Sequence, residues 1–164
     1  MACDSTYPRA IISMNGGSWY DASRCNAGTG RPSVLHANCY GDPTVRYHGG
    51  EFTGWPGRPY PAATAVTHRW AAKSRCNRIA SFTPESFATN LGAPTDIQEH
   101  LNCEDHNRVV HWAFQSTDHV VSFLLPYFVE HAIVNFAMGG FVRDSDGDGV
   151  RDDVDTTPYD SNHH

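Results

Sequence analysis

Arg108-Val-Val-His-Trp-Ala-Phe114 sets the class of the fold, because this run is short, apolar and rich in β-branched and aromatic residues. Such a run predicts a strand that is buried within a sheet. Arg9-Ala-Ile-Ile-Ser-Met14 and Ser33-Val-Leu-His-Ala37 have the same character, and Asn15-Gly-Gly ends the first of them. These three segments therefore predict the strands of one sheet.

The segments between and after these strands predict two helices. Residues 62–74 place Val66 and Trp70 one helical turn apart, and residues 126–138 begin with proline and stop before two glycines. Residues 41–61, rich in Gly, Pro and aromatic residues, predict a long surface excursion. This order favours the α/β class, with a parallel sheet and flanking helices. Three strands alone leave a sheet edge uncovered, so we expect a missing N-terminal half or a homo-oligomer paired along that edge.

The net charge of −6 is concentrated at the C-terminal end of the 164 residues. From residue 141 onward, seven Asp and two Arg give −5, which leaves −1 for the rest of the chain. A nearly neutral body argues against a nucleic-acid partner, which requires a basic face. The sequence contains no run of about 18 apolar residues, so it predicts no membrane-spanning helix. Met1-Ala-Cys-Asp4 does not predict a signal peptide, so we expect a removed export signal or a longer parent protein.

The charged end contains a regular acidic loop, Asp144-Ser-Asp-Gly-Asp-Gly-Val-Arg-Asp-Asp-Val-Asp155. Alternating carboxylates of this kind can wrap Ca²⁺, which takes six to eight oxygens. The predicted ligands are the carboxylates of Asp144, Asp146, Asp148, Asp152 and Asp155 and the backbone carbonyl of Val150. The loop ends in Asp instead of the Glu of an EF-hand and is followed by Thr-Thr-Pro, so it resembles a thrombospondin type 3 repeat. That resemblance implies a secreted or extracellular setting. A solvated acidic tail is the alternative.

Two polar residues follow predicted strands. Asp42 comes after the second strand and His119 after the third. Catalytic groups collect beyond the carboxyl ends of parallel strands, and an Asp followed by a His is the second half of the order Ser, Asp, His used by α/β-hydrolases. Asp42 would orient the imidazole of His119, which would act as the general base. The alternatives are a turn-forming Asp before Pro43 and a core or helix-entry histidine.

Several further segments match a known family in the same order. They are Met1-Ala-Cys-Asp4, Arg9-Ala-Ile-Ile-Ser-Met-Asn-Gly-Gly17, Arg24-Cys25 with Arg31-Pro-Ser-Val-Leu-His36, Asp42-Pro-Thr-Val-Arg-Tyr-His-Gly-Gly50, Trp70-Ala-Ala-Lys-Ser-Arg-Cys76 and His119. With these segments, residues 1–138 resemble the C-terminal half of the secreted polyhydroxybutyrate depolymerase and feruloyl esterase family of α/β-hydrolases. The resemblance implies a partial α/β-hydrolase domain over residues 1–140, followed by an irregular calcium-binding tail over residues 141–164. It implies an ester substrate, either a polyester or an aromatic acid ester.

The chain departs from that family at the nucleophile. No G-x-S-x-G occurs in it, and the family would supply its serine from sequence before Met1. Asn38-Cys-Tyr-Gly-Asp42 replaces the usual His-Gly-Thr-x-Asp, and Gln115-Ser-Thr-Asp118 replaces a glycine-rich segment. We therefore expect esterase ancestry with little or no activity in this chain alone. The alternative is a non-enzymatic, calcium-stabilised extracellular module for binding or assembly.

The five cysteines include no C-x-x-C pair, which disfavours a zinc knuckle or a redox motif. An exported protein would form two disulfides and leave one thiol, whereas a cytosolic one would keep all five reduced. The family resemblance implies the pairs Cys76–Cys103 and Cys3–Cys25, with Cys39 outside a bridge. The ten histidines include no H-E-x-x-H, so a zinc site is disfavoured.

Overall fold

The computed structural model describes residues 9–25, 30–52, 57–88, 93–104, 107–116, 119, 132–133 and 136–137. For residues 25, 80–88 and 93–94 it describes the backbone only. The predicted calcium loop and most of the predicted helix 126–138 lie outside these residues. Within them, no helix is long and apolar enough to cross a membrane.

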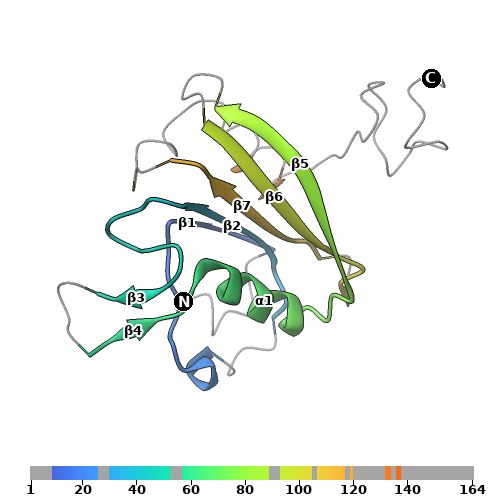
Figure 1. Ribbon diagram of the computed structural model, residues 1–164. Helices are drawn as coiled ribbons and strands as arrows, with labels where there is room; N and C mark the ends of the chain where they lie inside the picture. The colour runs from blue at the N-terminus through green and yellow to red at the C-terminus, as the bar shows by residue number, and fades with distance from the viewer. Residues whose placement is uncertain are drawn as a thin grey trace.

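Figure 1 shows one large sheet with a helix packed on it and a small two-stranded sheet beside the helix. The strands of the large sheet are β1 (Ala10–Met14), β2 (Ser33–Cys39), β5 (Arg78–Ala88), β6 (Ala93–Leu101) and β7 (Val109–Phe114). The small sheet joins β3 (Gly50–Glu51) to β4 (Pro59–Tyr60), the helix α1 is Ala63–Lys73, and a 3-10 turn covers Ala22–Cys25. The strand order of the large sheet is β1-β2-β7-β6-β5.

The three predicted strands correspond to β1, β2 and β7. These strands are parallel neighbours, as expected, and the predicted helix 62–74 corresponds to α1. The expectation of a three-stranded sheet is wrong, because β5 and β6 form an antiparallel hairpin that pairs with β7. The sheet is therefore mixed, and β6 pairs with β7 on the side away from β2. In the described part of the chain, β1 is the outer strand at the other side.

The predicted surface excursion 41–61 is also more ordered than expected. It contains the β3–β4 pair, and the ring of Phe52 packs on that of Tyr60 with centroids 4.7 Å apart. The Tyr60 hydroxyl accepts a hydrogen bond of 2.9 Å from the backbone N–H of Arg46. Aromatic side chains and the β3–β4 pair therefore hold the two ends of this loop together.

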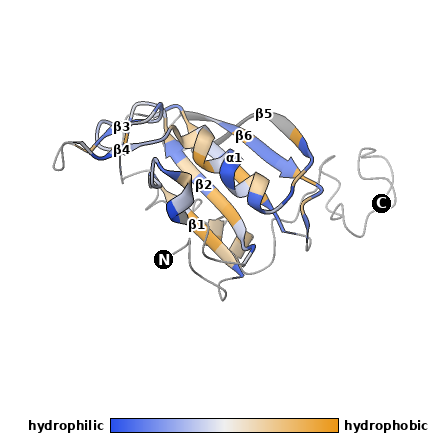
Figure 2. Ribbon diagram, turned by 90° about the horizontal axis from the view of Figure 1, so that it is seen from below, coloured by the Kyte–Doolittle hydropathy of each residue, from blue (hydrophilic) through white to orange (hydrophobic). Residues whose placement is uncertain are grey.

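The core occupies both faces of the large sheet, because successive side chains of a strand point to opposite faces. One face carries the main cluster, formed by Leu35, Ala37, Cys39, Ile97, Val110, Trp112, Phe114, Ala132 and Phe136. On the other face α1 packs against β2 and β7 and buries Val66 and Thr67. Figure 2 shows apolar residues along β1 and β2, and β2 is buried along nearly its whole length. Ala132 and Phe136, which lie within the predicted helix 126–138, are both buried in the main cluster.

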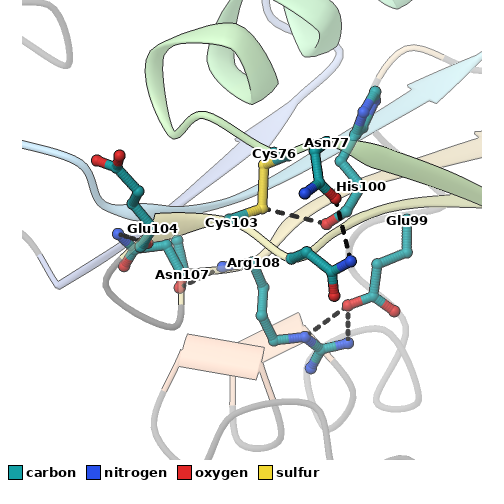
Figure 3. Close-up of a disulfide and its surroundings, with 10 residues drawn as sticks. Cys76, Asn77, Glu99, His100, Cys103, Glu104, Asn107 and Arg108 are labelled. Atoms are coloured by element: carbon teal, nitrogen blue, oxygen red, sulfur yellow. Dashed lines mark hydrogen bonds and ion pairs between the residues drawn. A yellow bond between two sulfur atoms is a disulfide. The ribbon is translucent and has the colours of Figure 1, made fainter.

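A disulfide between Cys76 and Cys103 joins the end of α1 to the end of β6, as predicted (Figure 3). It closes a loop with a sequence separation of 27, which stabilises the fold by about 3–4 kcal/mol. Cys39 is buried and is not disulfide-bonded, as expected. Cys3 and the side chain of Cys25 lie outside the described parts, so their pairing stays a prediction.

The same corner of the molecule holds a well-shielded ion pair. Arg108 donates from its Nε and Nη2 atoms to Oε1 of Glu99, each at 2.7 Å (Figure 3). The Glu99 side chain is 9% exposed, so removal of Arg108 would leave a carboxylate without its partner in a poorly solvated place. The pair connects the start of β7 to β6 next to the disulfide.

Candidate active site

Asp42 and His119 lie beyond the carboxyl ends of β2 and β7. These ends are neighbours because the two strands are adjacent and parallel. The ladder between these strands continues beyond their ends. The backbone N–H groups of Tyr40 and Gly41 donate to the carbonyl oxygens of Phe114 and Ser116, each at 2.9 Å. The two chain segments therefore leave the sheet side by side, which brings the residues that follow them together.

The carboxylate of Asp42 is fully buried and uses its two oxygens for different purposes. Oδ1 accepts hydrogen bonds from the backbone N–H groups of Thr44 at 2.7 Å and Val45 at 3.1 Å. Oδ2 lies 2.7 Å from Nδ1 of His119. The turn-forming reading of Asp42 and the imidazole-orienting reading are therefore both satisfied, because the turn holds the second oxygen toward the ring.

The ring of His119 keeps access to solvent, since its side chain is 36% exposed. The carboxylate of Asp42 accepts the proton on Nδ1, so the neutral ring carries its lone pair on Nε2. This is the tautomer that a general base requires, because Nε2 can then take a proton from a nucleophile.

Asn15, at the end of β1, is hydrogen-bonded to the segment that carries Asp42 and to the segment that carries His119. The sequence analysis did not predict this role for Asn15. Its Oδ1 accepts a hydrogen bond of 2.7 Å from the backbone N–H of Cys39, and its Nδ2 donates to the carbonyl oxygen of His119 at 2.6 Å. The residue is 3% exposed and has a φ of 43°. Asparagine tolerates this left-handed conformation better than most residues, and the Asn15-Gly-Gly turn was the available signal.

A stack of buried rings lies beneath α1 and does not include Asp42 or His119. The centroid of His111 lies 5.6 Å from that of His36 and 5.7 Å from that of Tyr47. Nδ1 of His36 lies 3.2 Å from the Thr67 hydroxyl, and its Nε2 lies 3.1 Å from the carbonyl oxygen of Gly16. These contacts pack α1 against β2 and β7.

Burial keeps this stack neutral. Burial, followed by repulsion from His36, lowers the pKa of His111 to about 3. Burial also lowers the pKa of His36, and burial followed by repulsion from His68 lowers that of His100. Neutral imidazoles can bind metals, but within the described ranges no three His, Cys, Asp or Glu side chains gather in a geometry that could hold an ion. We assign the stack a structural role.

A cavity of about 760 Å³ lies between β1, α1 and the 3-10 turn. Ser13 and His36 stand on its wall together with Trp19, Arg24 and Trp70. Arg24 stacks over the Trp19 ring at 4.5 Å from its centroid. Neither Asp42 nor His119 lines this cavity, so it is separate from the dyad.

The structure thus brings Asp42 and His119 together, whereas the predicted calcium ligands at positions 144–155 lie outside the described residues. No protein-family model, curated protein or solved structure matches the chain.

Proposed function

We propose that Asp42 and His119 are the acid and the base of a secreted serine hydrolase that cleaves carboxylic esters. The observation that carries the proposal is the 2.7 Å contact between Asp42 Oδ2 and His119 Nδ1, at the carboxyl ends of two adjacent parallel strands. The substrate class, a polyester or an aromatic acid ester, follows from the resemblance to the polyhydroxybutyrate depolymerase and feruloyl esterase family.

In the proposed reaction, Nε2 of His119 removes the proton from a serine hydroxyl as its oxygen attacks the ester carbonyl carbon. Asp42 holds the ring by its Nδ1–H and stabilises the imidazolium that forms. The imidazolium then gives its proton to the alkoxide leaving group, and an alcohol departs from the acyl-enzyme. Water enters by the same proton transfers and releases the carboxylic acid.

The serine itself comes from a polypeptide segment outside this sequence, because no G-x-S-x-G occurs here. The open position is beside β1, the outer strand of the described sheet. A further parallel strand paired with β1 would bring its carboxyl end to the edge that carries Asp42 and His119. A serine at the end of such a strand would complete the site.

The chain alone is expected to show no turnover of p-nitrophenyl butyrate above that of its His119→Ala variant. A general base without a nucleophile has nothing to activate, and loss of a triad member lowers hydrolysis by about 10⁴-fold or more. The measurement is p-nitrophenolate release at equal protein concentrations. Saturable turnover that disappears in the His119→Ala variant would show that the nucleophile lies within the chain.

We also propose that the acidic loop binds Ca²⁺ and that calcium stabilises the tail over residues 141–164. Support comes from the donor set: the five spaced carboxylates and the Val150 carbonyl form a hard, oxygen-only set that suits this ion. The second candidate function is a non-enzymatic, calcium-stabilised extracellular module for binding or assembly. It holds if the tail binds calcium and no serine completes the site. Dyad chemistry and calcium binding are independent, so each has its own test.

Calorimetric titration of the chain with Ca²⁺ is expected to show saturable binding that weakens by at least about tenfold in an Asp146→Asn/Asp148→Asn variant, because two ligand charges are lost. An Asp160→Asn variant serves as the matched control, since Asp160 follows the loop. Equal calcium affinity in all three proteins would exclude the assigned ligands. Absence of calcium binding by the unaltered chain would exclude the site.

A further inference from the structure

Buried Asn15, at the end of β1, is hydrogen-bonded to the end of β2 and to the segment that carries His119. Its backbone N–H donates to the carbonyl oxygen of Ala37 at 2.7 Å, which fixes the end of β1 on β2. Its Oδ1 accepts from the Cys39 N–H, three residues before Asp42, and its Nδ2 donates to the carbonyl oxygen of His119. The amide therefore spans the segments that carry the acid and the base.

We propose that Asn15 is a positioning residue for the dyad: its amide fixes the backbone of His119 relative to the end of β2 and so keeps the imidazole on Asp42. This inference rests on the proposed function. Asn15 touches neither reacting atom of the dyad, so it acts through the two backbones that it joins. The turn around Asp42 fixes the carboxylate from one side, through Thr44 and Val45, and Asn15 fixes the ring from the other.

The position requires an amide because one group donates and the other accepts. Aspartate would retain the acceptor for Cys39 but lose the donor to His119, and its charge would face a carbonyl oxygen. Alanine would lose both bonds and would be strained at a φ of 43°. Glycine tolerates that φ and removes the side chain without adding charge, so it separates the hydrogen bonds from the backbone conformation.

The bond from Asn15 to His119 is shielded, because Asn15 is 3% exposed. Water does not readily replace a lost partner at such a place, so the carbonyl of His119 would reorient toward another donor. A rotation of the backbone at His119 displaces the ring from Oδ2 of Asp42. The hydrogen bond between them, now 2.7 Å long, would then lengthen and weaken. The effect of Asn15 is therefore expected in the ring's tautomer and hydrogen bond.

The test is nitrogen NMR of the imidazole of His119 in the ¹⁵N-labelled chain. Asn15→Gly and Asn15→Asp are each expected to lower the ratio of the Nδ1–H to the Nε2–H tautomer by about fivefold, the equivalent of one ordinary hydrogen bond. Asn102→Gly is the matched control, because Asn102 also has a positive φ, of 54°, and its amide donates to exposed Asn77 instead. That variant is expected to leave the His119 signals unchanged.

A double-mutant cycle separates positioning from general stability. In an Asp42→Asn background, Asn15→Gly is expected to leave the His119 tautomer ratio unaltered, since no carboxylate remains to hold the ring. An unchanged ratio in Asn15→Gly and Asn15→Asp, with the Nδ1–H tautomer intact in the unaltered chain, would overturn the role of Asn15 alone. Absence of that tautomer in the unaltered chain would instead contradict the proposed function.

Discussion

In a polypeptide that carries the proposed serine segment ahead of this sequence, Asp42→Asn is expected to lower kcat/KM for p-nitrophenyl butyrate by about 10⁴-fold. The amide cannot accept the Nδ1 proton through its nitrogen, so the ring adopts the tautomer that leaves Nε2 protonated and unable to act as a base. His119→Ala is expected to cause a loss at least as large. The measurement compares initial rates of p-nitrophenolate release.

Asp21→Asn is the matched control for this loss, because Asp21 is exposed and its carboxylate accepts hydrogen bonds from neighbouring Ser23. It is expected to leave kcat/KM unchanged. A fall of less than about tenfold in Asp42→Asn would mean that Asp42 does no more than shape its turn. Asp42→Asn and His119→Ala combined are expected to lower kcat/KM by far less than the product of their separate losses, since the two residues act as a unit.

Acid is expected to destabilise the fold strongly, through the buried histidine stack. The pKa of His111 falls from 6.5 to about 3 on folding, so below pH 6.5 the unfolded chain takes up a proton that the folded chain refuses. Stability is therefore present above pH 6.5 and is lost as the pH falls toward 3. His111 alone accounts for about 1.4 kcal/mol per pH unit, or roughly 5 kcal/mol in all. Burial lowers the pKa of His36 and His100 in the same direction, which steepens the loss.

Urea unfolding at pH 7 and pH 5 measures this effect. In a His111→Phe variant, whose ring can still stack between Tyr47 and His36, the loss of stability over that range is expected to be about 2 kcal/mol smaller. A His48→Gln variant is the control, because His48 is exposed. If His111→Phe shows the full pH dependence of the unaltered chain, the stack does not control acid stability.

The strands that were predicted correctly, β1, β2 and β7, are short runs rich in apolar residues, and β2 and β7 are buried on both faces. Buried parallel strands such as β2 and β7 are mostly apolar along their length, so runs such as Arg108-Val-Val-His-Trp-Ala-Phe114 are recognisable without a structure. The hairpin of β5 and β6 was missed for the opposite reason. In Ala93–Leu101 most residues are polar or proline, and Figure 2 shows β6 as largely hydrophilic. β6 is held in the sheet by pairing with β5 on one side and β7 on the other, and a local hydrophobic pattern does not reveal such cross-strand pairing.

The candidate site divides in the same way. Asp42 and His119 were found because their residue types, chain order and positions after strands are local features. The role of Asn15 depends on a contact with His119, 104 residues away in sequence, so the local pattern Asn15-Gly-Gly indicated only a turn. The sequence around Asp42 and Pro43 indicated a turn. It did not show that the backbone N–H of Val45 donates to the Asp42 carboxylate within that turn.

The tautomer of His119 tests the central claim most directly, because the account requires Asp42 to accept the proton on Nδ1. In the ¹⁵N-labelled chain near neutral pH, the account predicts that neutral His119 is predominantly the Nδ1–H form, with a downfield-shifted Nδ1 proton, and that Asp42→Asn converts it to the Nε2–H form. A predominantly Nε2–H ring in the unaltered chain, or a tautomer ratio that Asp42→Asn leaves unchanged, would contradict it.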